Sequence, residues 1–141
     1  MANSGYPERL TIPAVGRYGT VEYAVDGDGK SEAADWLDHQ PLNIRAQFGV
    51  LFVRLVNEGR ISNSEQFKQL EGQVCEFKRG EHRFLCYRDG SRYLLTHRVK
   101  KGPKKAFQRE IKRAQEIGEA HLSREALLSR EKISTRKRKR K

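Results

Sequence analysis

Between Val74 and Val99 the chain alternates between apolar and polar side chains with the two-residue period of β-strands. Gly80-Glu81 and Asp89-Gly90 interrupt this alternation. Such dipeptides between apolar runs are typical of tight hairpin loops. The pattern therefore predicts three consecutive antiparallel strands joined by two short turns.

The two turns fix the register of the three strands, and the register assigns each side chain to a face of the sheet. With Gly80-Glu81 as a two-residue loop, Lys78 lies opposite Arg83; with Asp89-Gly90 as another, Arg83 lies opposite Thr96. One face then collects the side chains of a core: Cys75, Phe77, Phe84, Cys86, Tyr93 and Leu95. The other face collects cations and one aromatic ring: Lys78, Arg83, Tyr87, Arg92 and Arg98. A sheet face of this kind is suited to binding a polyanion.

Upstream of these strands, the hydrophobic pattern predicts one strand and two helices. Residues 18–25 alternate, and the turn-forming tetrad Asp26-Gly27-Asp28-Gly29 ends the alternation. Apolar residues then recur with helical spacing in residues 30–39, and again from Pro41 to a C-terminal cap at Gly59.

A short turn is predicted before the three central strands and a helix after them. Ser62 and Glu65 form a capping-box pattern that opens the short turn, which includes Phe67 and Leu70. A long helix is predicted to begin near Pro103, and Gly118 weakens the prediction that it is straight. Its apolar stripe comprises Phe107, Ile111, Ala114, Ile117, His121 and Leu122.

The predicted order of elements is β-α-α-β-β-β-α, which is an α+β fold of a size that suits one domain. Residues 18–122 would form this domain. Residues 1–17 are predicted to be a flexible N-terminal arm, and residues 123–141 a basic C-terminal extension. We expect residues 135–141, which are basic after Thr135, to be disordered.

Composition excludes several classes of protein. The sequence has neither a run of 18 apolar residues nor a signal-peptide pattern, so we expect a cytoplasmic protein without a membrane partner. Cys75 and Cys86 could be neighbours across two strands, but in a reducing cytosol two buried thiols are expected rather than a disulfide. No spacing of Cys or His resembles a metal site, and no cofactor is expected.

The charge is distributed unevenly. Residues 1–70 carry a net charge of −2 and residues 71–141 a net charge of +13, which together give the +11 of the chain. An asymmetry of this kind indicates nucleic acid or another acidic partner rather than a generally basic surface.

The order and spacing of four segments resemble the RelE/ParE toxin superfamily, most closely its HigB-like branch of phage and bacterial chromosomes. The segments lie between about residues 18 and 122 and read VEYAVDGDGKSEAADWL, LVNEG, FKQLEGQVCEFKRGEHRFLCY and LLTHRVKKGPKKAFQREIKRA. The resemblance implies a small twisted antiparallel sheet with two N-terminal helices packed on one face and a C-terminal helix.

The resemblance also implies a function. HigB-like proteins are toxins of type II toxin–antitoxin systems, which cut mRNA on the ribosome without a metal ion. An antitoxin neutralises them, and here we expect a helix-turn-helix protein. The partners implied are therefore the cognate antitoxin, the ribosome and mRNA.

The cationic positions of the family fall on Lys78, Arg83 and Arg98 of this chain. When a 2′-hydroxyl attacks its own phosphate, arginine can stabilise the charge that develops on the phosphorane. Arg83 and Arg98 are the candidates for this role, with Lys78 assisting or acting as the base. The candidate RNA-binding residues are Tyr87, Arg92, Lys100, Lys101, Lys104 and Lys105. Tyr87 would either stack on a base or pack at the edge of the sheet.

Two histidines and one glutamate lie near these cations. His82 and His97 are predicted to face each other on the core side, near the strand ends. A structural pair is the favoured interpretation, and an acid–base pair is the alternative, because histidine titrates near neutral pH. Glu76 is expected to be a charge partner of the neighbouring cations.

Two other functions fit the same fold. A ParE-like toxin would inhibit DNA gyrase by binding it, without catalysis, although the basic sheet face argues against this function. A non-catalytic nucleic-acid-binding protein would have lost the residues of the reaction. The family often has an aromatic or acidic residue near the C-terminal helix, where this chain offers His121.

Overall fold

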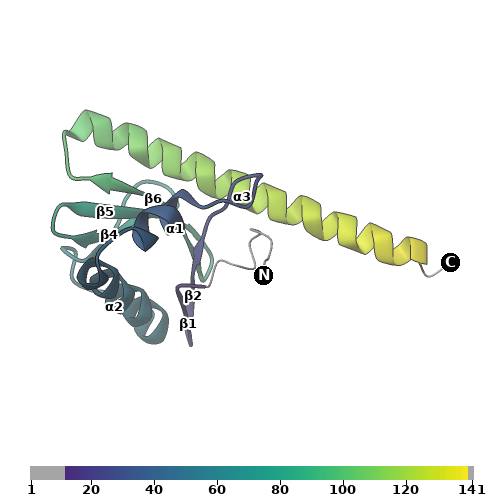
Figure 1. Cartoon of the computed structure of the whole chain (residues 1–141), viewed down its shortest axis with the longest axis horizontal. Helices are drawn as coiled ribbons and strands as arrows, with labels where there is room; N and C mark the ends of the chain where they lie inside the picture. Colours follow the sequence, from purple (N-terminus) through teal and green to yellow (C-terminus); the bar gives the residue numbers. More distant parts are fainter. Residues whose placement is uncertain (1–11, 140–141) are drawn as a thin grey trace.

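The computed structural model describes residues 12–139, with side chains to Ile133, as a six-stranded sheet between two layers of helix (Figure 1). The strands are β1 (Ala14–Gly16), β2 (Gly19–Tyr23), β3 (Phe67–Gln69), β4 (Val74–Arg79), β5 (His82–Asp89) and β6 (Arg92–Lys100). The helices are α1 (Glu32–Asp38), α2 (Leu42–Glu58) and α3 (Lys104–Lys139). The strand order is β1-β2-β6-β5-β4-β3, and all neighbours are antiparallel except β2 and β6, which are parallel. The α+β prediction is confirmed, with this parallel pair and two short edge strands added to it.

Helices α1 and α2 cover the first face of the sheet, and local capping fixes where they start and stop. The Ser31 hydroxyl accepts a hydrogen bond from the Ala34 backbone N–H at 3.0 Å, which caps α1. Gly59 ends α2 in the left-handed conformation, with φ of 82°. All six residues predicted for the core face are buried beneath these helices, together with Phe48, Phe52 and Leu55 of α2.

Helix α3 covers the second face. Ile111 and Ala114 pack against Val74 and Leu85, and the next turns of the helix pack against Tyr87 and Leu94. The helix then continues past the edge of the sheet to Lys139 (Figure 1). The expectation that residues 135–141 are disordered is therefore wrong as far as Lys139, and residues 140–141 lie outside the described part of the chain.

Gly118 lies where α3 packs directly on the Tyr87 side chain. A Cβ atom on this residue would overlap the Cβ and Cγ atoms of Tyr87. The glycine that weakened the helix prediction therefore leaves α3 intact and provides room for the Tyr87 ring. Gly49, in the middle of α2, has open space around its Cα instead.

The hairpins keep the predicted faces but change one register. The β4–β5 register is confirmed, with Lys78 opposite Arg83 and Cys75 opposite Cys86, and both cysteines are buried free thiols as expected. In the β5–β6 hairpin Asp89 pairs with Arg92, so the loop is Gly90-Ser91 and not Asp89-Gly90. Gly90 has a positive φ of 62°, which a glycine at the first loop position adopts without strain. The shift of two residues leaves every side chain before the following bulge on its predicted face.

Two further predictions hold only in part. The short turn predicted after Ser62 is present, because Asn63 accepts from the backbone N–H groups of Glu65, Gln66 and Phe67, but the turn ends before Phe67, which begins β3. Strand β3 follows at once and pairs with β4. Most of the predicted arm, residues 1–11, lies outside the described residues, while β1 occupies residues 14–16 of it.

We predict opposite effects for alanine at the two helical glycines. Gly118→Ala should lower the free energy of unfolding by about 1–3 kcal/mol because the new methyl group displaces Tyr87 or α3. Gly49→Ala, the matched control, should raise it by up to ~1 kcal/mol because alanine favours the helix. Urea denaturation measures both, and equal effects of the two substitutions would contradict the packing described here.

Candidate functional site

Six of the sequence-predicted residues gather at one end of the sheet, which we call the cationic end: Lys78, Arg83, Lys100, Lys101, Lys104 and Lys105. The β4–β5 hairpin, the end of β6 and the start of α3 meet there. His82 pairs with Lys100, and the backbone N–H of Lys101 donates to the Glu81 carbonyl at 2.8 Å. The four lysines that follow Val99 are exposed, whereas Lys78 and Arg83 are half-buried.

Arg83 is held against the turn beside it. Its Nη1 donates to the carbonyl oxygens of Gly80, at 2.8 Å, and His82, at 3.1 Å. Its Nε lies 3.6 Å from Oε1 of Glu76. The guanidinium is thus restrained on two sides, which reduces the entropy it would lose on binding a phosphate.

Glu76 is a carboxyl group buried among cations. It is 4% exposed and lies directly opposite Lys68 of β3. Burial raises the pKa of Glu76, although Lys78, Arg83 and Lys68 act in the opposite direction. Oε1 has no hydrogen-bond partner among the described residues.

Arg98 lies on the opposite face of the sheet from Lys78 and Arg83, so its predicted place beside them is wrong. The β5–β6 register shifts by one residue after the Cys86–Leu95 pair, and Leu85 pairs with His97 rather than Thr96. This β-bulge moves the side chains at the end of β6 to the opposite face of the sheet, because one extra residue reverses the alternation of all the residues that follow it.

On the first face, Arg98 joins an aromatic cluster near α1. Its guanidinium lies over the Trp36 ring, 5.2 Å from the centroid, and Nη2 lies 2.7 Å from Nδ1 of His82. Burial and the Arg98 charge lower the pKa of His82. The neutral ring accepts from Arg98, which gives this arginine a packing role at the edge of the core.

The same bulge moves His97 to the second face, so the prediction that His82 and His97 face each other is wrong. His97 is 1% exposed; its Nε2 lies 2.9 Å from Glu110 Oε1 of α3, and its Nδ1 lies 3.1 Å from Thr96 Oγ1. Burial lowers the pKa of His97, although Glu110 opposes this effect. His97 therefore links β6 to α3 and is not exposed to a ligand.

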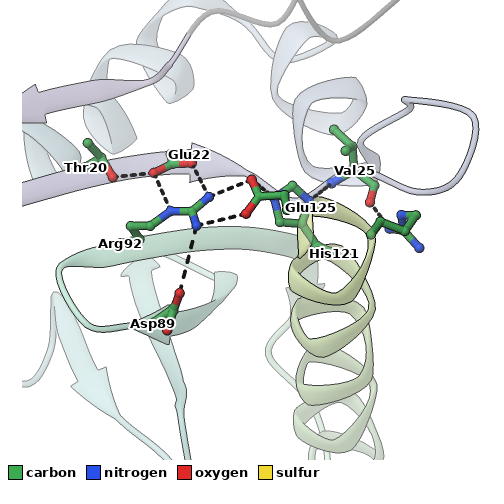
Figure 2. Close-up of polar contacts among 8 residues, drawn as sticks. Thr20, Glu22, Val25, Asp89, Arg92, His121 and Glu125 are labelled. Atoms are coloured by element: carbon green, nitrogen blue, oxygen red, sulfur yellow. Dashed lines mark hydrogen bonds and ion pairs between the residues drawn. The ribbon is translucent and has the colours of Figure 1, made fainter. Parts of the chain in front are cut away.

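Tyr87 and Arg92 lie toward the other end of the sheet, beneath α3. Tyr87 is 9% exposed under Gly118, which agrees with the packing alternative and leaves no ring face for a base. Arg92 binds two carboxylates at once (Figure 2): Nε and Nη2 donate to Glu22 at 3.0 and 2.9 Å, and Nη1 and Nη2 donate to Glu125 at 2.9 and 2.8 Å. Few N–H donors of this guanidinium therefore remain for a phosphate.

His121 completes the contact between α3 and the sheet. The Val25 backbone N–H donates to His121 Nδ1 at 3.0 Å, so Nε2 carries the proton and donates to Glu125 Oε2 at 3.1 Å (Figure 2). The hydrogen bond from Arg92 lowers the pKa of Glu125. We call Glu22, Arg92, His121 and Glu125 the α3 latch. His121 is the residue that this chain offers near the C-terminal helix, where the family often has an aromatic or acidic residue, and here it belongs to the α3 latch.

Sequence comparison assigns the chain to a family. The family described as "Phage derived protein Gp49-like (DUF891)" matches residues 35–118, more than half of the chain. The chain belongs to this Gp49-like family. It is a RelE/ParE-like family whose members are commonly toxins of toxin–antitoxin systems, so an antitoxin partner is expected. No curated protein matches the sequence significantly.

The matched region contains the cationic end and the first turns of α3, and ends at Gly118. None of the described helices combines the length and apolar composition needed to cross a membrane. Among the described residues, no group of three or more His, Cys, Asp or Glu side chains could hold a metal ion.

We predict that Arg92→Met weakens the docking of α3 in this Gp49-like chain. The substitution keeps the aliphatic stem but leaves Glu22 and Glu125 without their partner. The free energy of unfolding should fall by about 1–2 kcal/mol, a value reduced by the partial exposure of the three side chains. Arg109→Met, on the exposed surface of α3, should change it by less than ~0.5 kcal/mol. Equal stabilities by thermal denaturation would contradict the latch.

Proposed function

We propose that this Gp49-like chain is a HigB-like toxin of a type II toxin–antitoxin system that cleaves mRNA on the ribosome. The cationic end carries the proposal: Lys78 and Arg83 lie opposite each other on one sheet face, and exposed lysines of the β6–α3 junction border them. The site can therefore bind several phosphates of an RNA chain at once.

The proposed reaction is attack of a ribose 2′-hydroxyl on the adjacent phosphate. The nucleophile loses a proton, negative charge builds up on the phosphorane oxygens, and the 5′-oxygen of the next nucleotide leaves with a proton. Arg83 is placed to stabilise the charge, because the turn carbonyls and Glu76 hold its guanidinium near the surface. Lys78, its neighbour across the strands, supports it as a second cation or as the base.

The remaining candidate residues differ in whether RNA could reach them. Lys100, Lys101, Lys104 and Lys105 are exposed and would bind the phosphates that flank the cleaved bond. Arg98, Tyr87 and Arg92 are left out of the proposed RNA contact, because the first packs on Trp36 and the other two are covered by α3.

The partners proposed are the ribosome with its mRNA and a helix-turn-helix antitoxin, in the cytoplasm. The basic tail, residues 136–141, would add affinity for ribosomal RNA that weakens with salt. No metal ion takes part in the proposed mechanism.

Arg83→Ala should abolish growth inhibition while the protein stays folded. Arg83 is a cation beside the buried Glu76 carboxylate, so its loss should lower the free energy of unfolding by about 1–3 kcal/mol. It should also remove about 3 kcal/mol of transition-state stabilisation, or about a hundredfold in rate. Arg88→Ala, an exposed arginine of the same strand, is the matched control and should remain toxic. Full toxicity of Arg83→Ala at equal abundance would rule out the proposed role.

The purified protein should cleave ribosome-bound mRNA efficiently and free mRNA negligibly. A site built mainly from lysine and arginine stabilises charge, but in-line attack also requires an oriented RNA, and orientation is worth many powers of ten in rate. Primer extension on mRNA with and without ribosomes measures this difference. Efficient cleavage of free RNA would contradict the proposal, and DNA breaks accumulating with gyrase, without RNA cleavage, would establish the ParE-like alternative.

A further inference from the structure

We propose that Glu76 is a positioning residue that holds Arg83 in its active orientation, and that it does so when its carboxyl group is ionised. The proposal rests on the mRNA cleavage proposed above, since it concerns the arginine that would act on the phosphate. It gives a role to a buried carboxyl group that the RNA contacts do not use.

Glu76 is buried within the sheet. It lies in the middle of β4, with β3 on one side and β5 on the other, opposite Lys68 and Leu85 respectively. Its side chain is 5% exposed, so water solvates the carboxylate poorly. A buried carboxylate is costly unless cations compensate it.

The orientation of the Arg83 guanidinium is restrained by its contacts. Nη1 donates to the Gly80 and His82 carbonyls, and Nε lies on the side of Glu76, 3.6 Å from Oε1. Hydrogen bonds at Nη1 and an ion pair at Nε set the direction of Nη2 as well, because the guanidinium is planar.

The contact between Glu76 and Arg83 depends on charge. At 3.6 Å the Glu76–Arg83 contact is an ion pair longer than a hydrogen bond, so its strength depends on the carboxylate charge. The charged groups that face Glu76 are Lys68 of β3, Lys78 of β4 and Arg83 of β5. Burial nevertheless raises the pKa of Glu76, which brings its protonation closer to neutral pH.

The ionisation of Glu76 sets the direction of the pH effect on cleavage. Above the raised pKa, Glu76 is ionised and attracts Nε of Arg83. As the pH falls through that pKa, the carboxyl group is protonated and the attraction is lost. The rate of cleavage should therefore fall on the acidic side with the titration of Glu76.

The experiment compares the wild-type chain, Glu76→Gln and the control Glu71→Gln, which removes the same charge at an exposed position before β4. The first readout is NMR: the carboxyl carbon of Glu76 and the Nε–H signal of Arg83 are followed against pH. The second readout is the single-turnover rate of mRNA cleavage on ribosomes over the same pH range. The NMR titration of the wild type needs no variant, so it remains informative if Glu76→Gln folds poorly.

We expect the Arg83 Nε–H signal to titrate together with Glu76 in the wild type and in Glu71→Gln, and to lose this titration in Glu76→Gln. Cleavage by Glu76→Gln should be about tenfold to a hundredfold slower, as for a displaced catalytic group. Its rate should also lose the decrease at acidic pH that the titration of Glu76 causes in the wild type. An Arg83 Nε–H signal that does not change as Glu76 titrates would overturn the proposal. So would a Glu76→Gln variant whose cleavage rate has the pH profile of the wild type. Coupled NMR titrations with no cleavage by the wild type would support the positioning of Arg83 and overturn the proposed function alone.

Discussion

The packing of α3 against the second face of the sheet determines which cations of this protein can meet a ligand. The helix buries Leu85, Leu94 and Tyr87, and the latch of Arg92 with Glu22 and Glu125 fastens it to strands β2 and β6. A charged, aromatic face that alternation assigns to solvent is thereby largely covered. What remains available is the cationic end, where the helix begins.

Close approach of the helix depends on a missing side chain. Gly118 lies on the Tyr87 ring, and an added methyl group would overlap it. Beneath the helix, polar groups are paired rather than excluded: His97 meets Glu110, and His121 meets the Val25 backbone. Glu76 lies at the edge of this covered area, close enough to the cationic end to act on Arg83 and buried enough for its protonation to matter.

The strand pattern predicted the α+β order, the β4–β5 register and the buried core face, because these depend on alternation and on turn residues. The β-bulge after Leu95 was not predictable in this way, since one extra residue leaves no compositional trace. It places Arg98 with Trp36 and His97 with Glu110, and so separates residues that strict alternation puts together. The role of Arg92 was missed for another reason: its partners, Glu22 and Glu125, are distant in sequence. For Tyr87, packing was one of two predicted alternatives, and its neighbour Gly118 is also distant in sequence. A glycine inside an apolar helical stripe was the one available signal of a close contact.

We propose that RNA binds this Gp49-like protein at the cationic end and not across the whole sheet face. An NMR titration of the wild-type chain with a short RNA that carries a 2′-deoxy substitution, and so cannot be cleaved, tests this proposal. The signals that shift should cluster at Lys78, Arg83, Lys100 and Lys101, while those of Tyr87 and Arg92 stay in place. Shifts centred on Tyr87 and Arg92, with the cationic end unchanged, would contradict it.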